Sequence, residues 1–160
     1  MGRGRRLAAA GGLTTSVVAL AIAATAALAA TIIGTQGDDQ LTGTPANDRI
    51  AALGGNDTVR ALAGDDRVRA GDGDDSVGAG PGRDRLGGGP GDDRLNGGPG
   101  DDLLAGHRGA DILLAGSGHD AVRGGGGPDL IRIGSPRDAG PSTIGRPAGP
   151  VLTGSPHGTA

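Results

Sequence analysis

The sequence contains no cysteine, phenylalanine, tryptophan or tyrosine, and it also lacks lysine and glutamate. The absence of cysteine excludes a disulfide framework and thiol chemistry. Without aromatic side chains, any hydrophobic core must be thin and built from aliphatic residues. All fifteen cationic side chains are therefore arginine, and all eighteen anionic ones are aspartate. Several side chains that commonly act as general acids, bases or nucleophiles are missing.

No motif in the chain is typical of a catalytic site. Ser135, Ser142 and Ser155 lie near the C-terminus, outside any Gly-x-Ser-x-Gly sequence. The three histidines do not recur at a common spacing, and we expect them to face solvent rather than to bind a soft metal. We therefore expect a protein that is not an enzyme.

Glycine is abundant, at 36 of 160 residues, which without a period would indicate disorder. Residues 34–132, however, consist of one nine-residue unit written eleven times without insertion or deletion, as in a solenoid. We number these repeats from Gly34. The fourth residue is glycine in every repeat except at Ala46, and the eighth is always Leu, Ile or Val. The sixth residue is always aspartate: Asp39, Asp48, Asp57, Asp66, Asp75, Asp84, Asp93, Asp102, Asp111, Asp120 and Asp129.

Each repeat predicts a tight turn followed by a very short strand. Residues 89–97 show the pattern clearly, with a glycine-rich turn that ends in aspartate and one aliphatic residue between two polar ones. Since side chains alternate along a strand, the eighth residue is expected to face inward. Turns rich in Gly, Asp and Asn can present carboxylate and carbonyl oxygens, which suit Ca²⁺.

The unit Gly-Gly-x-Gly-x-Asp, followed by x, an aliphatic residue and x, resembles the repeat of the RTX, or haemolysin-type, calcium-binding proteins. The resemblance covers residues 34–132 and implies an all-β fold, a right-handed parallel β-roll with two repeats in each turn. It also implies that Ca²⁺ lies between turn loops of repeats two apart, with the sixth-position aspartates as ligands in two columns. Eleven repeats paired in this way would hold at most about nine ions.

Several repeats depart from the pattern. Leu53 and Leu62 replace glycine at the second position, and Ala46 replaces it at the fourth. Four repeats lack an Asp or Asn at the fifth position, where Arg83, Ala110, His119 and Pro128 stand. Repeats five to eight match the pattern best. We expect the N-terminal third to bind calcium more weakly or to serve partly as an end cap.

The charge of the repeat region bears on folding. Residues 34–132 carry seventeen Asp against ten Arg, a net charge of −7 that opposes compaction. A solvated acidic surface is the alternative interpretation of so many aspartates. The thin core offers little free energy against the loss of backbone entropy, which favours a chain that folds when it binds calcium.

The N-terminus predicts export. Arg3, Arg5 and Arg6 precede an uncharged stretch over residues 7–33, and Ala27 and Ala29 supply the small residues of a cleavage site. We expect a secretory signal peptide over residues 1–29. The alternative is an uncleaved membrane anchor. The general secretory and twin-arginine routes both stay open.

The expected mature protein is secreted, or held at the cell surface, with no membrane association after signal removal and no nucleic-acid partner. Residues 133–160 lose the period and are rich in Pro, Gly, Ser and Thr, which predicts a disordered tail.

Late repeats carry apolar residues at positions that should face outward. Leu103, Ile112, Leu114 and Leu130 stand where earlier repeats have mostly polar, small or Arg residues. We expect Ile112, Leu114 and Leu130 to lie on adjacent strands of one sheet. The tail residues Ile144, Val151 and Leu152, or a second molecule, could cover them. Scattered exposure is the alternative.

Two functions follow from these observations. The first is an exported calcium-binding repeat protein whose Ca²⁺ ions drive folding. The second is a structural or adhesive surface scaffold that calcium only rigidifies, and that self-associates or binds a partner through Ile112, Leu114 and Leu130.

Overall fold

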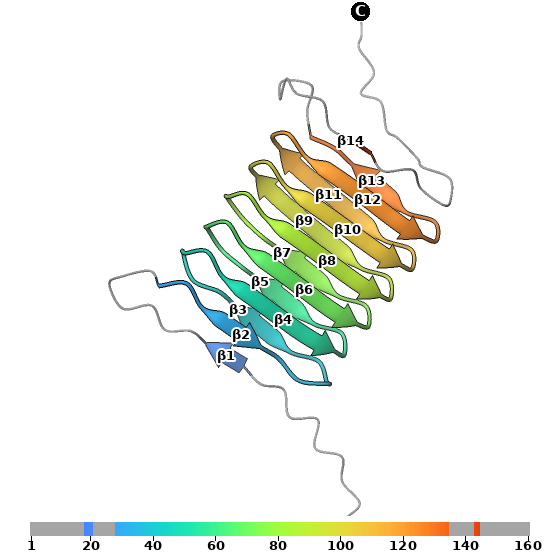
Figure 1. Ribbon diagram of the computed structural model, residues 1–160. Coiled ribbons are helices and arrows are strands. Elements are labelled where there is room, and N and C mark those ends of the chain that lie inside the picture. The colour runs from blue at the N-terminus through green and yellow to red at the C-terminus, as the bar shows by residue number, and fades with distance from the viewer. Residues whose placement is uncertain (1–17, 21–27, 135–142, 145–160) are drawn as a thin grey trace, which may run out of the picture.

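The computed structural model describes residues 18–20, 28–134 and 143–144, with side chains described only over 28–134. These residues form strands and loops, which confirms the predicted all-β class. The strands build two parallel sheets of seven strands each, stacked face to face in a β-solenoid (Figure 1).

We call the two sheets the odd sheet and the even sheet, after their strand numbers. The odd sheet contains, in order, β1 (Val18–Leu20), β3 (Gln40–Thr42), β5 (Thr58–Arg60), β7 (Ser76–Gly78), β9 (Arg94–Pro99), β11 (Ile112–Ser117) and β13 (Leu130–Arg132). The even sheet contains β2 (Thr31–Ile33), β4 (Arg49–Gly54), β6 (Arg67–Asp72), β8 (Arg85–Pro90), β10 (Leu103–Arg108), β12 (Ala121–Gly126) and β14 (Thr143–Ile144).

The nine-residue period sets the register of both sheets. Within the repeats, paired residues are eighteen positions apart, as with Leu95 and Leu113 on β9 and β11. Two repeats therefore make one turn, and residues 31–132 form about six turns. Each residue of a repeat stacks on the same position of the next turn, so the same side-chain types recur along each column.

The core lies between the two sheets and is as thin as the composition predicts. The first, sixth and eighth residues are buried in every repeat except at Gly34, which is partly buried, and Thr44 and Gly54 are buried in addition. The eighth-position side chains of Leu95, Leu104 and Leu113 are fully buried. The first position is Gly or Ala; at Gly88, a β-carbon would collide with the carboxylate of Asp93 in the same repeat and crowd the carbonyl of Gly106 one turn later. The roll begins three residues earlier than predicted, because Ile32 on β2 adds one more aliphatic side chain to the core.

Several strands are longer than the predicted three residues. Strands β4, β6, β8, β9, β10, β11 and β12 each span six residues. The first three residues of the following repeat continue the pairing, as His107 does with Gly125. Loops at equivalent positions stack in register, so their backbones also form hydrogen bonds between turns. For example, the N–H of Gly91 donates to the carbonyl of Arg108, 2.9 Å away.

From repeat three onward, two residues of each loop adopt left-handed backbone conformations. They are the second and the fourth residues of the repeat. Gly91 illustrates the fourth position: its φ is +136°, and a β-carbon there would collide with the carbonyl of Gly73 in the previous turn. At the second position, Leu53, Leu62 and His107 adopt φ values of 85° to 87°. A left-handed conformation costs an L-residue about 1–2 kcal/mol, so these three repeats are strained.

The predicted signal peptide and tail fall largely outside the described residues. Their described parts include β1, which pairs with β3, and β14, which pairs with β12. Among the described residues, no helix is long and apolar enough to cross a membrane.

Candidate metal centre

The sixth-position aspartates lie in two columns, as the resemblance implies, and all eleven are buried, with at most 5% of each residue exposed. A backbone hydrogen bond joins each column along the roll. The N–H of Asp75 donates to Oδ1 of Asp93, 2.9 Å away, and the N–H of Asp84 donates to Oδ1 of Asp102 at the same distance. We call this series the sixth-position ladder. It fixes one oxygen of each carboxylate and aims the carboxylate into the loop.

The other carboxylate oxygen, Oδ2, is unsatisfied in most repeats. In repeats three to eleven it is buried and has no hydrogen-bond partner among the described residues. These nine aspartates are Asp57, Asp66, Asp75, Asp84, Asp93, Asp102, Asp111, Asp120 and Asp129. In repeat seven this oxygen lies against Gly88, where a β-carbon would collide with it. Buried polar atoms are rarely left without a partner. Nine such oxygens in regular succession therefore indicate that they bind something other than the protein.

Repeats one and two satisfy the same oxygen internally. The N–H of Thr35 donates to Oδ2 of Asp39, and the N–H of Thr44 donates to Oδ2 of Asp48, both at 2.5 Å. The Thr44 hydroxyl also donates to Oδ1 of Asp48 at 2.9 Å, and the N–H of Ala30 donates to that oxygen at 2.6 Å. The sequence contains the signal for this difference, because only these two repeats have threonine at the second position.

The fifth residues form a second ladder that runs in the opposite direction. The N–H of Asp92 donates to Oδ1 of Asp74 at 2.8 Å, and the N–H of Ala110 donates to Oδ1 of Asp92 at 2.7 Å. Here the earlier repeat supplies the acceptor, whereas in the sixth-position ladder the later repeat does. The sequence analysis missed this role, although Asp or Asn stands at the fifth position in seven of eleven repeats.

The departures at the fifth position fit this second ladder. Arg83 has no acceptor to offer, and its guanidinium instead donates to Oδ2 of Asp101, 3.2 Å away. The N–H of His119 donates to Oδ1 of Asp101 and, with Arg83, lowers the pKa of Asp101. Ala110 also lacks an acceptor, but the residue one turn later is Pro128, which has no N–H to satisfy.

Burial dominates the electrostatics of the sixth-position ladder. Desolvation raises the pKa of Asp93 and Asp102 to about 7, although a backbone N–H donated to each carboxylate opposes the change and neighbouring carboxylates add to it. The same causes raise the pKa of Asp66 and Asp75 to about 6. Burial also raises the pKa of Asp57, Asp84 and Asp111. The ionised form of these carboxylates therefore lacks a compensating positive charge.

A calcium ion fits this arrangement. Nowhere in the described residues do three or more His, Cys, Asp or Glu side chains gather as a metal-binding group. A cation at these loops must therefore take most of its ligands from backbone carbonyls, with few carboxylate oxygens. Calcium accepts that mixture, whereas zinc and softer metals prefer nitrogen and sulfur ligands. The unsatisfied Oδ2 atoms are the side-chain ligands that the loops can offer.

The raised pKa values predict how pH affects the cation-free protein. An aspartate in an unfolded chain has a pKa of about 3.9. Between about pH 4 and pH 7 the folded chain thus binds more protons than the unfolded chain, and its stability falls as the pH rises. In calcium-free buffer we expect a stronger β-sheet circular dichroism signal at about pH 5 than at about pH 8. A signal that is constant over this range would contradict the pKa changes.

Comparison with known proteins agrees with the repeat pattern. A family model described as the RTX calcium-binding nonapeptide repeat (4 copies) matches residues 29–59, 52–86, 79–113, 87–122 and 96–131. No curated protein matches the chain.

Proposed function

This chain belongs to the RTX calcium-binding nonapeptide repeat family, and from that premise we propose that Ca²⁺ ions held between its loops drive the roll to fold. The observation that supports this proposal is the series of nine buried Oδ2 atoms without a partner. Each belongs to a repeat that has another repeat stacked before it in the same column. Repeats one and two, which begin the columns, satisfy their own oxygens through Thr35 and Thr44.

The cost of burying anions explains why folding would depend on the metal. A buried carboxylate without a counter-charge is strongly unfavourable, and it either takes up a proton or binds a cation. The aliphatic core, with no aromatic side chain, supplies little free energy to offset several such groups. Binding free energy from calcium would then become folding free energy.

The proposed setting is outside the cell. Proteins with RTX repeats are typically exported, and the predicted signal peptide agrees with export. Extracellular calcium modules bind with dissociation constants of about 0.1–1 mM, so the ion would act there at its ambient concentration. We propose a role in binding and folding, with no catalytic step.

Equilibrium dialysis against calcium tests this function directly. We expect about nine ions per chain at saturation, one for each unpartnered Oδ2. We also expect the β-sheet circular dichroism signal to rise over the same calcium range as binding. A chain that reaches its full β-sheet signal before any calcium binds would overturn the proposal.

One observation favours a second candidate, a scaffold that associates through its outer surface. Ile112 on β11 lies directly beside Leu130 on β13, which confirms the predicted adjacency, and Leu114 follows on the same face of β11. We call Ile112, Leu114 and Leu130 the apolar patch. Ile144 was predicted to cover this patch, but it lies on β14 beside β12, in the other sheet. Val151 and Leu152 lie outside the described residues.

Replacing Ile112, Leu114 and Leu130 together with Thr tests this candidate. Threonine keeps β-propensity and removes the apolar surface. If a second copy covers the patch, the calcium-loaded parent should have the mass of a dimer in light scattering, and the triple variant that of a monomer. Leu103→Thr, which removes an exposed Leu from the even sheet, is the control and should leave the mass unchanged. A monomeric parent would refute self-association.

A further inference from the structure

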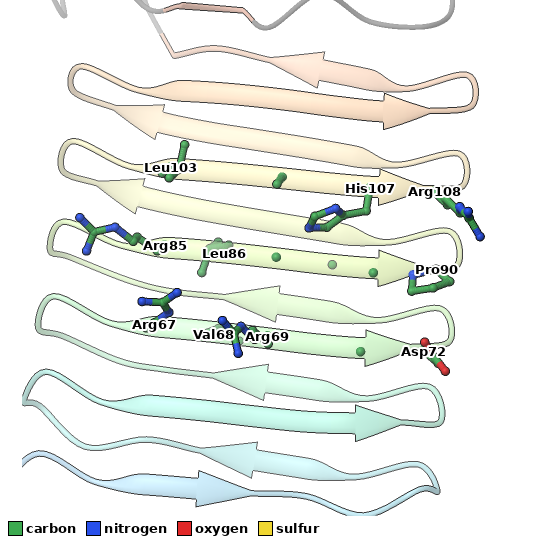
Figure 2. A pocket seen from close by; sticks show the side chains of 15 residues that line it. Arg67, Val68, Arg69, Asp72, Arg85, Leu86, Pro90, Leu103, His107 and Arg108 are labelled. Atoms are coloured by element: carbon green, nitrogen blue, oxygen red, sulfur yellow. The ribbon is translucent and has the colours of Figure 1, made fainter.

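We propose that a groove on the outer face of the even sheet binds an acidic polysaccharide. The groove has a volume of about 630 Å³ and lies over β8, between β6 and β10 (Figure 2). Its floor is formed by the backbone of Gly87 and Gly89, which have no side chains to fill the space between the neighbouring strands. The imidazole of His107 borders it, since a β-carbon added to Gly87 would lie 3.6 Å from Nε2.

The groove is basic although the protein as a whole is acidic. Arg67, Arg69 and Arg85 lie at one end and Arg108 at the other, while Asp72 is the one carboxylate that lines it (Figure 2). Arg67 and Arg85 occupy paired positions on adjacent strands. Like charges side by side on a sheet repel each other. Neither arginine has an ion pair within the described part of the chain. An anionic group between them would relieve this repulsion.

The residues favour carboxylate or sulfate groups as the anions. Guanidinium groups bind planar or tetrahedral oxyanions with two parallel hydrogen bonds, whereas an ammonium group acts as a point charge. Arg85 begins β8, a strand of six residues and therefore about 20 Å long, and Arg108 stands beside its far end on β10, where Asp72 also lines the groove. A ligand with one anionic group between Arg67 and Arg85 and a second near Arg108 would contact the arginines along the length of the groove.

The shape of the groove favours a sugar chain over a peptide or a nucleic acid. Both edges of β8 are already paired, with β6 and β10, so an added peptide strand has no free backbone groups to bond. Single-stranded nucleic acids are commonly held by stacking on large aromatic side chains, and this chain has no Phe, Trp or Tyr. The glycines leave space over β8 that a sugar ring would occupy. These observations together favour a linear polymer of acidic sugars.

A glycine pair supplies the decisive experiment. Gly87→Val fills the groove without changing any charge, and its β-carbon would meet only ordinary van der Waals contacts. Gly78→Val is the matched control, because Gly78 occupies the same repeat position on the odd sheet and has no atom within 4 Å of an added β-carbon. Binding of fluorescent chondroitin sulfate to the full chain would be measured in calcium, with circular dichroism confirming that each variant is folded. We expect Gly87→Val to weaken binding about tenfold or more and Gly78→Val to leave it unchanged.

An arginine pair tests the electrostatic part of the inference. Arg67→Gln with Arg85→Gln should weaken binding about tenfold or more, because charge-assisted hydrogen bonds are lost. Arg60→Gln with Arg94→Gln removes the same charge from the odd sheet and should have little effect. Neutral dextran and monomeric glucuronate should not compete with the labelled polymer. The inference is overturned if the folded parent does not bind chondroitin sulfate, if both glycine variants bind alike, or if both arginine pairs weaken binding equally.

Discussion

In excess chelator at about pH 8, the chain without residues 1–29 is expected to lose most of its β-sheet circular dichroism signal, and to regain it when calcium is added at about 0.1–1 mM. The buried ladder explains the size of this effect. Without calcium, ionised carboxylates such as Asp75, Asp93 and Asp111 would lie one above another in a low-dielectric interior with one oxygen unpaired. In the proposed calcium-bound state, each of these oxygens would gain a partner.

Magnesium is the control for this experiment. Mg²⁺ is smaller, demands near-octahedral geometry and retains its water, so we expect it not to restore the signal at the same concentration. The transition with calcium should be steep, because each repeat is hydrogen-bonded to the repeats one turn before and after it. A full β-sheet signal in chelator would show that the core alone supports the roll.

Asp93→Asn is expected to have opposite effects with and without calcium. The asparagine Oδ1 can still accept from the N–H of Asp75, so the sixth-position ladder remains intact. The amide group replaces the unpartnered Oδ2 and removes a buried charge, which should stabilise the calcium-free roll, because a buried neutral amide is less costly than a buried uncompensated carboxylate. It also removes a calcium ligand, so the calcium midpoint should rise. Urea unfolding with and without calcium would measure both effects.

Asp48→Asn is the matched control, and it should be unfavourable in both conditions. Both oxygens of Asp48 accept hydrogen bonds, from Thr44 and Ala30. An amide NH₂ group in either place would face another donor, at a cost of about 1–3 kcal/mol whether or not calcium is present. Parallel behaviour of the two variants would mean that Asp93 has no special relation to calcium.

The nine-residue period and the family resemblance together predicted most of the fold. The family resemblance implied two repeats in each turn, and with it the nine-residue count assigned alternate repeats to opposite sheets and placed Ile112 beside Leu130. The alternation within each strand was sufficient to assign the core, including Leu95 and Leu113. These predictions succeed because the stacked turns share one local pattern along the roll, which leaves few other arrangements.

Several features of the site depend on contacts that no single repeat contains. The fifth-position ladder joins Asp74 to the backbone of Asp92, and its role is hidden in sequence because Asp and Asn also favour turns. The extended length of β8 depends on the loops of adjacent turns pairing with each other. The left-handed backbone of Leu62 contradicts the preference of the residue itself, since the loops stacked on it impose their conformation.

The hydrogen bond between the N–H of Ala30 and Oδ1 of Asp48 would change if the predicted signal peptide, residues 1–29, is removed. If a signal peptidase cuts after Ala29, that amide becomes a free α-ammonium group, and its hydrogen bond to the Asp48 carboxylate becomes an ion pair at the start of the roll. A chain that begins at Ala30 should then be more stable with a free N-terminus than with an acetylated one, as urea unfolding would reveal. Removal of the signal peptide would in this way place a positive charge beside Asp48, the first aspartate of its column.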